Sequence, residues 1–180
     1  MKTKTREVVF VALFSVFMAV CAWITVPGVV PFTMQSFAVF LALCLLGAKR
    51  GTAAILLYLL LGALGLPVFS NFTAGVGVLL GPNGGYMIGW LLMGAVLWLV
   101  EIFGSKKPFW RVAALVMGQL LCYAVGTVWF VAVYTVQTGP VGVGTALIWC
   151  VVPFVLPDFA KLFLALWMTK RLQKVLKICV

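Results

Sequence analysis

Two ionisable residues lie inside the last long apolar segment of the chain, and their spacing lets them act on one ligand. Asp158 and Lys161 are three residues apart, so on a helix their side chains project from the same face. The pair offers a charged acceptor beside a charged donor. This combination suits recognition of a small polar molecule, acid–base chemistry or an internal ion pair. Because a buried ion pair adds little stability compared with apolar packing, we expect these residues to serve a ligand.

The residues around the pair predict its depth. Pro157 removes a backbone hydrogen bond and indicates a kink or a helix start. Asp158 would then lie near a helix N-terminus, whose dipole favours a carboxylate. Counting back from Lys170 at 1.5 Å per residue puts Lys161 about 13 Å and Asp158 about 18 Å from the closing cluster of cations. If the segment crosses a membrane, both lie inside a hydrocarbon layer about 30 Å thick, where ionisable groups usually face a cavity or a partner.

A glycine-rich segment, residues 70–85, is the second candidate element of a site. Its glycines permit positive φ angles and close backbone approach. Asn71, Thr73 and Asn83 could supply amide and hydroxyl hydrogen bonds. The segment carries no cation and does not match the phosphate-binding G-x-x-x-x-G-K-[ST] pattern. It is either a flexible connection or a lid over a weakly charged ligand.

Polar residues also begin the second apolar segment. Thr33 and Gln35 stand among apolar neighbours, and each needs a hydrogen-bonding partner. They are expected on the same side of the membrane as residues 70–85 and Asp158. Aromatic residues near this level could wall a pocket, although such residues also anchor spans at the interface. They are Trp23, Phe32, Phe69, Phe72, Tyr86 and Trp149.

Composition places the chain among membrane proteins. Hydrophobic residues make up 65% of the 180 residues and charged residues 9%, far from the values of globular domains. The net charge of +10 comes from short clusters at alternate breaks between apolar runs. This pattern predicts both termini in the cytoplasm of a plasma membrane and contacts with anionic lipid, and it argues against nucleic-acid binding.

The apolar runs predict an all-α fold, a six-transmembrane-helix bundle in a single domain over residues 1–180. The last span contains Pro153 and Pro157, and a tight turn at Lys49–Gly51 joins the second span to the third. The first run is read as a retained span. The expected spans are residues 8–26, 30–48, 52–69, 86–103, 112–136 and 145–168.

Several function classes lack support. There is no histidine, and the five cysteines are scattered, so neither a metal site nor a disulfide framework is expected. No Walker-type loop and no nucleophile–base pair is visible, so an intramembrane enzyme is a minor alternative, as is a small channel or structural subunit. Ala12, Ser15 and Ala19 form a small-residue stripe that lets another helix approach. Glu101 is read as a surface charge.

Four segments carry a family resemblance. Residues 30–39 read V-P-F-T-M-Q-S-F-A-V and resemble the V-P-F-T-x-Q-x-F-A-V stretch of BioY proteins. Residues 61–69 (L-G-A-L-G-L-P-V-F), 81–86 (G-P-N-G-G-Y) and 157–161 (P-D-F-A-K) resemble the same family, in the same order. BioY proteins are the biotin-binding substrate subunits, or S components, of energy-coupling-factor (ECF) transporters.

The resemblance implies a six-helix bundle that captures biotin at its outward face, without a cofactor. It also implies partners: a transmembrane coupling subunit, which would meet the stripe at Ala12, Ser15 and Ala19, and two cytoplasmic ATPases that hydrolyse ATP. Three departures concern the loop and the stripe. Ser15 replaces the usual alanine, Asn83 the usual threonine, and residues 71–74 are less glycine-rich than in many relatives.

Biotin has two ureido N–H donors, a ureido carbonyl, an apolar thiophane ring and a valerate carboxylate. Asp158 suits the ureido N–H groups. Lys161 could bind the ureido oxygen, hold Asp158 or meet the carboxylate, and the sequence leaves these open. A substrate subunit for another small vitamin is the alternative. The expected ligand-binding residues are Asp158, Lys161, Gln35, Thr33, Phe32, Asn71, Phe72, Gly75, Asn83 and Tyr86.

Overall fold

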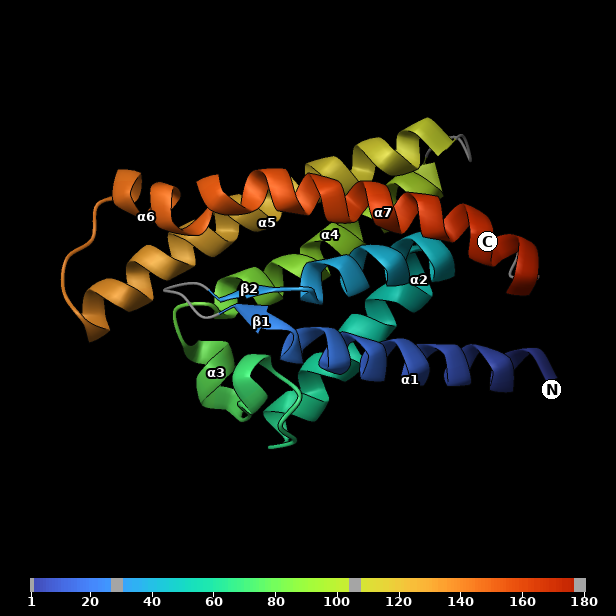
Figure 1. Cartoon of the computed structure of the whole chain (residues 1–180), viewed down its shortest axis with the longest axis horizontal. Helices are drawn as coiled ribbons and strands as arrows, with labels where there is room; N and C mark the ends of the chain where they lie inside the picture. Colours follow the sequence, from blue (N-terminus) through green and yellow to red (C-terminus); the bar gives the residue numbers. More distant parts are fainter. Residues whose placement is uncertain (1, 27–30, 104–107, 177–180) are drawn as a thin grey trace.

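The computed structural model describes residues 2–26, 31–103 and 108–176, which are mostly helical (Figure 1). Short elements, the strands β1 and β2, the 3-10 turn η1 and the helix α3, separate the long helices. In chain order the elements are α1 (Lys2–Trp23), β1 (Thr25–Val26), β2 (Phe32–Thr33), α2 (Gln35–Ala63), η1 (Ser70–Phe72), α3 (Val76–Leu80), α4 (Gly84–Phe103), α5 (Pro108–Gln137), α6 (Val143–Cys150) and α7 (Val152–Leu176).

Helix α2 reverses its direction at Gly47 and therefore makes two passes. Gly47 has φ 80° and ψ 174°, a conformation that only glycine adopts readily. Figure 1 shows the two limbs of α2 folding back on each other. Five helical segments in the described part are long and apolar enough to cross a membrane, and the break in α2 makes six passes. The predicted six-helix bundle is confirmed, but the turn lies at Gly47, and Lys49–Gly51 already belong to the returning helix.

Glu101 supports this reversal and is not a free surface charge. Its carboxylate accepts the Ala48 N–H at 3.1 Å, directly after the break. It also pairs with Arg111 on α5, at 3.2 Å. A helix that restarts after Gly47 has N–H groups without helical partners, and Glu101 on α4 satisfies one of them.

The two ends of the bundle hold different elements (Figure 1). One end, called here the terminal end, holds the start of α1 and the end of α7. The opposite loop end holds β1, β2, α3 and the connection between α5 and α6. At the terminal end lie the cations of the described helix ends, whereas Lys161 lies within the bundle.

The first three predicted spans have different bounds in the structure. The first ends at Trp23 instead of residue 26, since Thr25 and Val26 form β1. Val30, the predicted start of the second span, and Pro27-Gly28, the predicted end of the first, lie outside the described residues. Phe32 and Thr33 form β2, which pairs antiparallel with β1, and the helix begins only at Gln35. The third span ends at Ala63 instead of residue 69, because Gly65, at φ 99°, and Pro67 follow.

The sixth pass is interrupted before both of its prolines. Helix α6 ends at Cys150, and α7 starts at Val152. Pro153 lies in the first turn of α7, where a missing N–H costs nothing, and Pro157 lies inside the helix. Asp158 is therefore in the second turn of α7 and not at a helix N-terminus, which corrects the prediction. Side-chain hydrogen bonds stabilise its carboxylate instead.

The first limb of α2 forms the centre of the bundle. Residues 37–48 are all buried, as expected for a helix that is apolar on every face. Helix α2 packs against α1, α4 and α7, and α5 packs mainly against α4. Two glycines allow the close α4–α5 packing: a side chain at Gly89 would collide with Cys122, and one at Gly126 with the Tyr86 ring.

Candidate ligand-binding site

Asp158 is buried, with 5% of its surface exposed, and it is the centre of a hydrogen-bond network. Its Oδ1 accepts a hydrogen bond from Ser36 Oγ at 2.8 Å and faces Lys161 Nζ at 3.2 Å. Its Oδ2 accepts from Gln119 Nε2 at 3.1 Å and from Tyr123 Oη at 2.7 Å. These contacts fill the four acceptor positions of a carboxylate. The Asp158 network, defined as these five residues, joins α2, α5 and α7.

Lys161 also uses its hydrogen-bonding capacity within the protein. Its Nζ donates to the Thr33 carbonyl at 2.7 Å and to Ser36 Oγ at 3.0 Å, besides the contact with Asp158. These are three acceptors for three ammonium protons. The ammonium also lies 4.1 Å from the centre of the Phe32 ring, a favourable cation–π geometry. The structure thus brings Phe32, Thr33, Asp158 and Lys161 together.

Gln35 is held next to this network by a second set of hydrogen bonds. Its side-chain amide donates to the hydroxyl of Tyr58, and that hydroxyl donates to the Val68 carbonyl at 3.1 Å. Thr33 Oγ1 lies 3.4 Å from Gln35 Oε1. Gln35 is buried, so its amide has a fixed orientation at the wall of the site.

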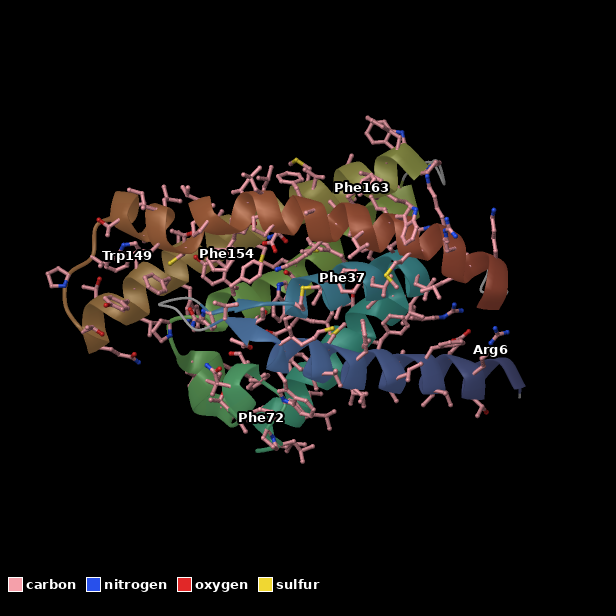
Figure 2. The ribbon with its side chains drawn as sticks, viewed as in Figure 1. Arg6, Phe37, Phe72, Trp149, Phe154 and Phe163 are labelled. Carbon is pink, nitrogen blue, oxygen red and sulfur yellow. The ribbon has the colours of Figure 1, made fainter. Side chains whose placement is uncertain are left out.

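A cavity adjoins these residues, and we call it the ligand cavity. Polar groups of the Asp158 network line it together with aromatic and sulfur-containing side chains. Figure 2 shows Phe154, one of these, on the inner side of α7. The lining consists of Pro31, Thr33, Gln35, Ser36, Ser70, Asn83, Tyr86, Met87, Trp90, Gln119, Cys122, Tyr123, Cys150, Phe154, Asp158 and Lys161.

Two acceptor atoms in this lining have no partner among the described residues. They are Asn83 Oδ1 and Gln119 Oε1, both fully buried. An unpaired buried acceptor costs free energy, and native proteins seldom leave one without a reason. Two such atoms among the residues that line one cavity suit a ligand that carries N–H donors.

Comparison with known proteins identifies the family. The BioY family model matches residues 1–178. The biotin transporter BioY of Thermotoga maritima is 41% identical over 171 residues, covering 94% of this chain and 96% of its own. The chain belongs to the BioY family. A probable biotin transporter BioY of Pyrococcus horikoshii is 40% identical, with 94% of this chain and 98% of its own covered.

The fold agrees with this family. A crystal structure of the S-component for biotin from an ECF-type ABC transporter matches with a TM-score of 0.79 at 27% identity. The match covers 96% of this chain and 93% of that one. The six-pass bundle is therefore the S-component fold, with the ligand cavity toward its loop end.

Four predicted site residues of this BioY chain do not line the cavity: Phe32, which contacts Lys161, and Asn71, Phe72 and Gly75 in the loop. Phe72 is 61% exposed and stacks on Trp23, with ring centres 4.9 Å apart. Asn71 precedes it, and both residues have positive φ angles. Gly75, at φ 96°, starts α3, and its N–H donates to the Gly62 carbonyl. Figure 2 shows Phe72 far from Phe154, because the left-handed turn directs this part of the loop outward.

Residues 70–85 still contribute to the cavity through Ser70 and Asn83, and Tyr86, which follows them, lines it as well. Tyr86 Oη lies 3.2 Å from Thr127 Oγ1, which fixes the phenol ring against α5. Of the aromatic wall predicted from the sequence, only Tyr86 lines the cavity. Phe69 is buried against Tyr58 at 5.6 Å between ring centres, where it supports the residue that holds Gln35.

Sequence reasoning missed the contribution of α5. Gln119 and Tyr123 both bind Asp158, and their i, i+4 spacing in an apolar span was a usable signal. Ser36 was overlooked beside Gln35. Trp90 and Phe154 carried no such signal, because an aromatic residue in a span looks the same whether it faces a cavity or lipid.

The small-residue stripe on α1 lies inside the bundle for two of its three members. Ser15 Oγ donates toward the Ala54 carbonyl of α2 at 2.8 Å, and Ser15 and Ala19 are 1% and 4% exposed. Only Ala12 is exposed. The stripe lets α1 approach the second limb of α2, so Ser15 and Ala19 are not available to an external helix as predicted.

Proposed function

We propose that this chain captures biotin in the ligand cavity, as the substrate-binding subunit of an ECF-type vitamin importer. The observation that supports this most is the pair of unpartnered acceptors, Asn83 Oδ1 and Gln119 Oε1, among residues that line the cavity beside the fully hydrogen-bonded Asp158 and Lys161. Biotin presents two ureido N–H donors, and relatives that are named biotin transporters match nearly the whole chain.

The polar residues of the cavity have two different roles in recognising the ligand. Asn83 and Gln119 accept the ureido hydrogens, and Asp158 holds Gln119 in place through its N–H donation. Asp158 was expected to bind the ureido group itself. Since its four acceptor positions are occupied, we assign it the role of organising the wall.

The apolar wall receives the fused rings. Trp90, Phe154 and Met87 line the cavity and supply apolar surface. Burial of apolar ring surface contributes about 25 cal/mol per Å², whereas the hydrogen bonds give selectivity against vitamins that lack a ureido group.

Equilibrium binding of labelled biotin to the purified chain in detergent tests this proposal. Saturable binding, displaced by unlabelled biotin and not by thiamine or riboflavin, is expected. Displacement by another vitamin in preference to biotin would support the alternative substrate. A folded chain that binds none of them would contradict the proposal.

The chain is a multi-pass membrane protein. We infer that it lies in the plasma membrane with the terminal end in the cytoplasm, because the cations of the described helix ends gather there. Energy comes from a transmembrane coupling subunit and two cytoplasmic ATPases, so this subunit binds but does not catalyse.

For the coupling subunit, we propose the outer face of α1 around Ala12. This small residue is exposed between Val8 and Val16, which are also exposed, so a partner helix can come close there. Ala12→Trp should reduce co-purification with the coupling subunit and leave biotin binding intact. Leu120→Trp, on the exposed face of α5, is the matched control. Equal co-purification of both variants would place the partner elsewhere.

A further inference from the structure

A second cavity opens at the terminal end of the bundle, away from the ligand cavity. It has a volume of about 490 Å³ and lies between the start of α5 and the end of α7. We call it the terminal groove. Its floor is apolar and comes from Leu43 and Cys44 of α2, Leu97 of α4 and Leu115 of α5. The groove exists because α5 packs mainly on α4, and α7 mainly on α2.

The mouth of the groove is cationic. Arg111 and Lys170 line it, together with the amide of Gln173. Glu101 is the acidic residue that faces Arg111 among the described residues, and it engages the Nη2 atom at 3.2 Å. A guanidinium has five N–H donors, so Arg111 retains donors for another anion. Lys170 is exposed.

The groove changes from polar to apolar along the membrane normal. From Gln173 at the mouth to Phe163 at the depth, ten residues of α7 rise about 15 Å. This is about half of a hydrocarbon core about 30 Å thick, which is the depth of one leaflet. The rims are open to the surrounding lipid, since Phe109 and Phe163 are 70% and 73% exposed.

We propose that the terminal groove binds an anionic phospholipid of the adjoining leaflet. The phosphate contacts Arg111 and Lys170, and one acyl chain lies along the accessible apolar lining at Phe163 and Leu166. Cationic pockets between spans on the cytoplasmic side favour acidic headgroups. A zwitterionic lipid would bring its own ammonium close to Arg111 and Lys170, so the groove should select against it.

Fluorescence quenching in vesicles tests this proposal, because Trp167 lines the groove. The chain is reconstituted in phosphatidylcholine that contains either brominated phosphatidylglycerol or brominated phosphatidylcholine. The Trp167 signal is the difference between the wild type and Trp167→Phe. We expect brominated phosphatidylglycerol to quench this signal more strongly at equal mole fraction.

Lys170→Gln should reduce the relative association constant for the anionic lipid by about fivefold. Lys174→Gln is the matched control, since it removes the same charge one turn further along α7 at a position that does not line the groove. Retained biotin binding by Lys170→Gln would show that the variant is folded.

Three results would overturn the proposal. Equal quenching by both brominated lipids would mean that bulk lipid fills the groove. Equal effects of Lys170→Gln and Lys174→Gln would indicate general surface charge. Loss of co-purification with the coupling subunit in Lys170→Gln, with no lipid selectivity in the wild type, would make the groove a protein-docking surface.

Discussion

Asp158 and Lys161 use their hydrogen-bonding capacity on the protein itself, and this changes what their substitution should do. Removal of Asp158 leaves the buried donors of Ser36, Gln119 and Tyr123 without their acceptor. Removal of Lys161 leaves the Thr33 carbonyl and Asp158 without their charged donor. The cost to binding therefore comes from cavity side chains that are no longer held in place.

We predict that Asp158→Asn weakens biotin binding by about 10- to 150-fold, equivalent to about 1.5–3 kcal/mol. Asparagine keeps the shape but removes the negative charge opposite Lys161, and its NH₂ group would face donors. Titration of labelled biotin in detergent measures the effect. Unchanged affinity in a folded Asp158→Asn variant would move the site away from this network.

Biotin amide, which lacks the valerate charge, tests the role of Lys161. Because the Lys161 ammonium already has three acceptors, wild type and Lys161→Ala should distinguish biotin from its amide by the same ratio. A ratio that falls to one only in Lys161→Ala would show that the lysine meets the carboxylate.

Gln119 offers the sharpest residue-level test of the unpartnered acceptors. Gln119→Leu removes both its N–H donation to Asp158 and its free Oε1, so we expect at least a tenfold loss of affinity, about 1.4 kcal/mol. Tyr123→Phe removes only one donation to Asp158 and should cost less. Equal losses of biotin affinity in the two variants would mean that Gln119 Oε1 does not contact biotin.

The site was only partly predictable at this scale. Asp158, Lys161, Thr33 and Gln35 stood out because a polar side chain in an apolar span needs a partner. Phe72 was predicted wrongly as a site residue, because its outward position follows from left-handed φ angles that its sequence context does not specify.

Among the helices, α2 depends on a contact from outside itself. The break at Gly47 exposes backbone N–H groups in a region that is otherwise apolar, and Glu101 satisfies that of Ala48. The same carboxylate faces Arg111, so one side chain ties α2, α4 and α5 together at the terminal end.

We predict that Glu101→Gln lowers the free energy of unfolding by about 1–3 kcal/mol, since it weakens a charged hydrogen bond to a buried N–H. Denaturation in mixed detergent, followed by helical circular dichroism, measures it. Glu7→Gln is the control: Glu7 pairs with Arg50 at 2.6 Å, but the side chains are 45% and 36% exposed. That pair should be worth less than about 1 kcal/mol. Equal losses would mean that Glu101 is an ordinary surface charge.

The elements themselves were largely predictable because apolar length determines a span. Helices α4 and α5 begin within four residues of their predicted starts. The start of α2 was not predictable from Pro31, since the β1–β2 pairing decides it and needs contacts between separate segments. Pro157 was read as a possible helix start, but it lies inside α7. Contacts with neighbouring helices stabilise a proline inside a membrane helix, and the sequence does not show these contacts.

For the whole molecule, the placement of cations predicts a membrane orientation. In a cysteine-free background, Val76→Cys and Val141→Cys should react with an impermeant thiol reagent added outside whole cells, because both belong to the loop end. Arg50→Cys, at the terminal end, should react only after the membrane is opened. Strong labelling of Arg50→Cys from outside would reverse the orientation. By their place in the sequence, Gly28 and Lys107 are equally suitable positions for cysteine labelling, but they lie outside the described residues.

The Asp158 network also has a consequence for heat resistance. It links α7 to α5 through Gln119 and Tyr123, although the two helices pack mainly on different neighbours. Biotin bound between α5 and α7 acts as a removable crosslink between these two helices. By mass action, biotin at 100 times its dissociation constant should stabilise the fold by about 2.7 kcal/mol. The melting temperature should therefore climb with the logarithm of biotin concentration, and this rise should require far more biotin in Asp158→Asn.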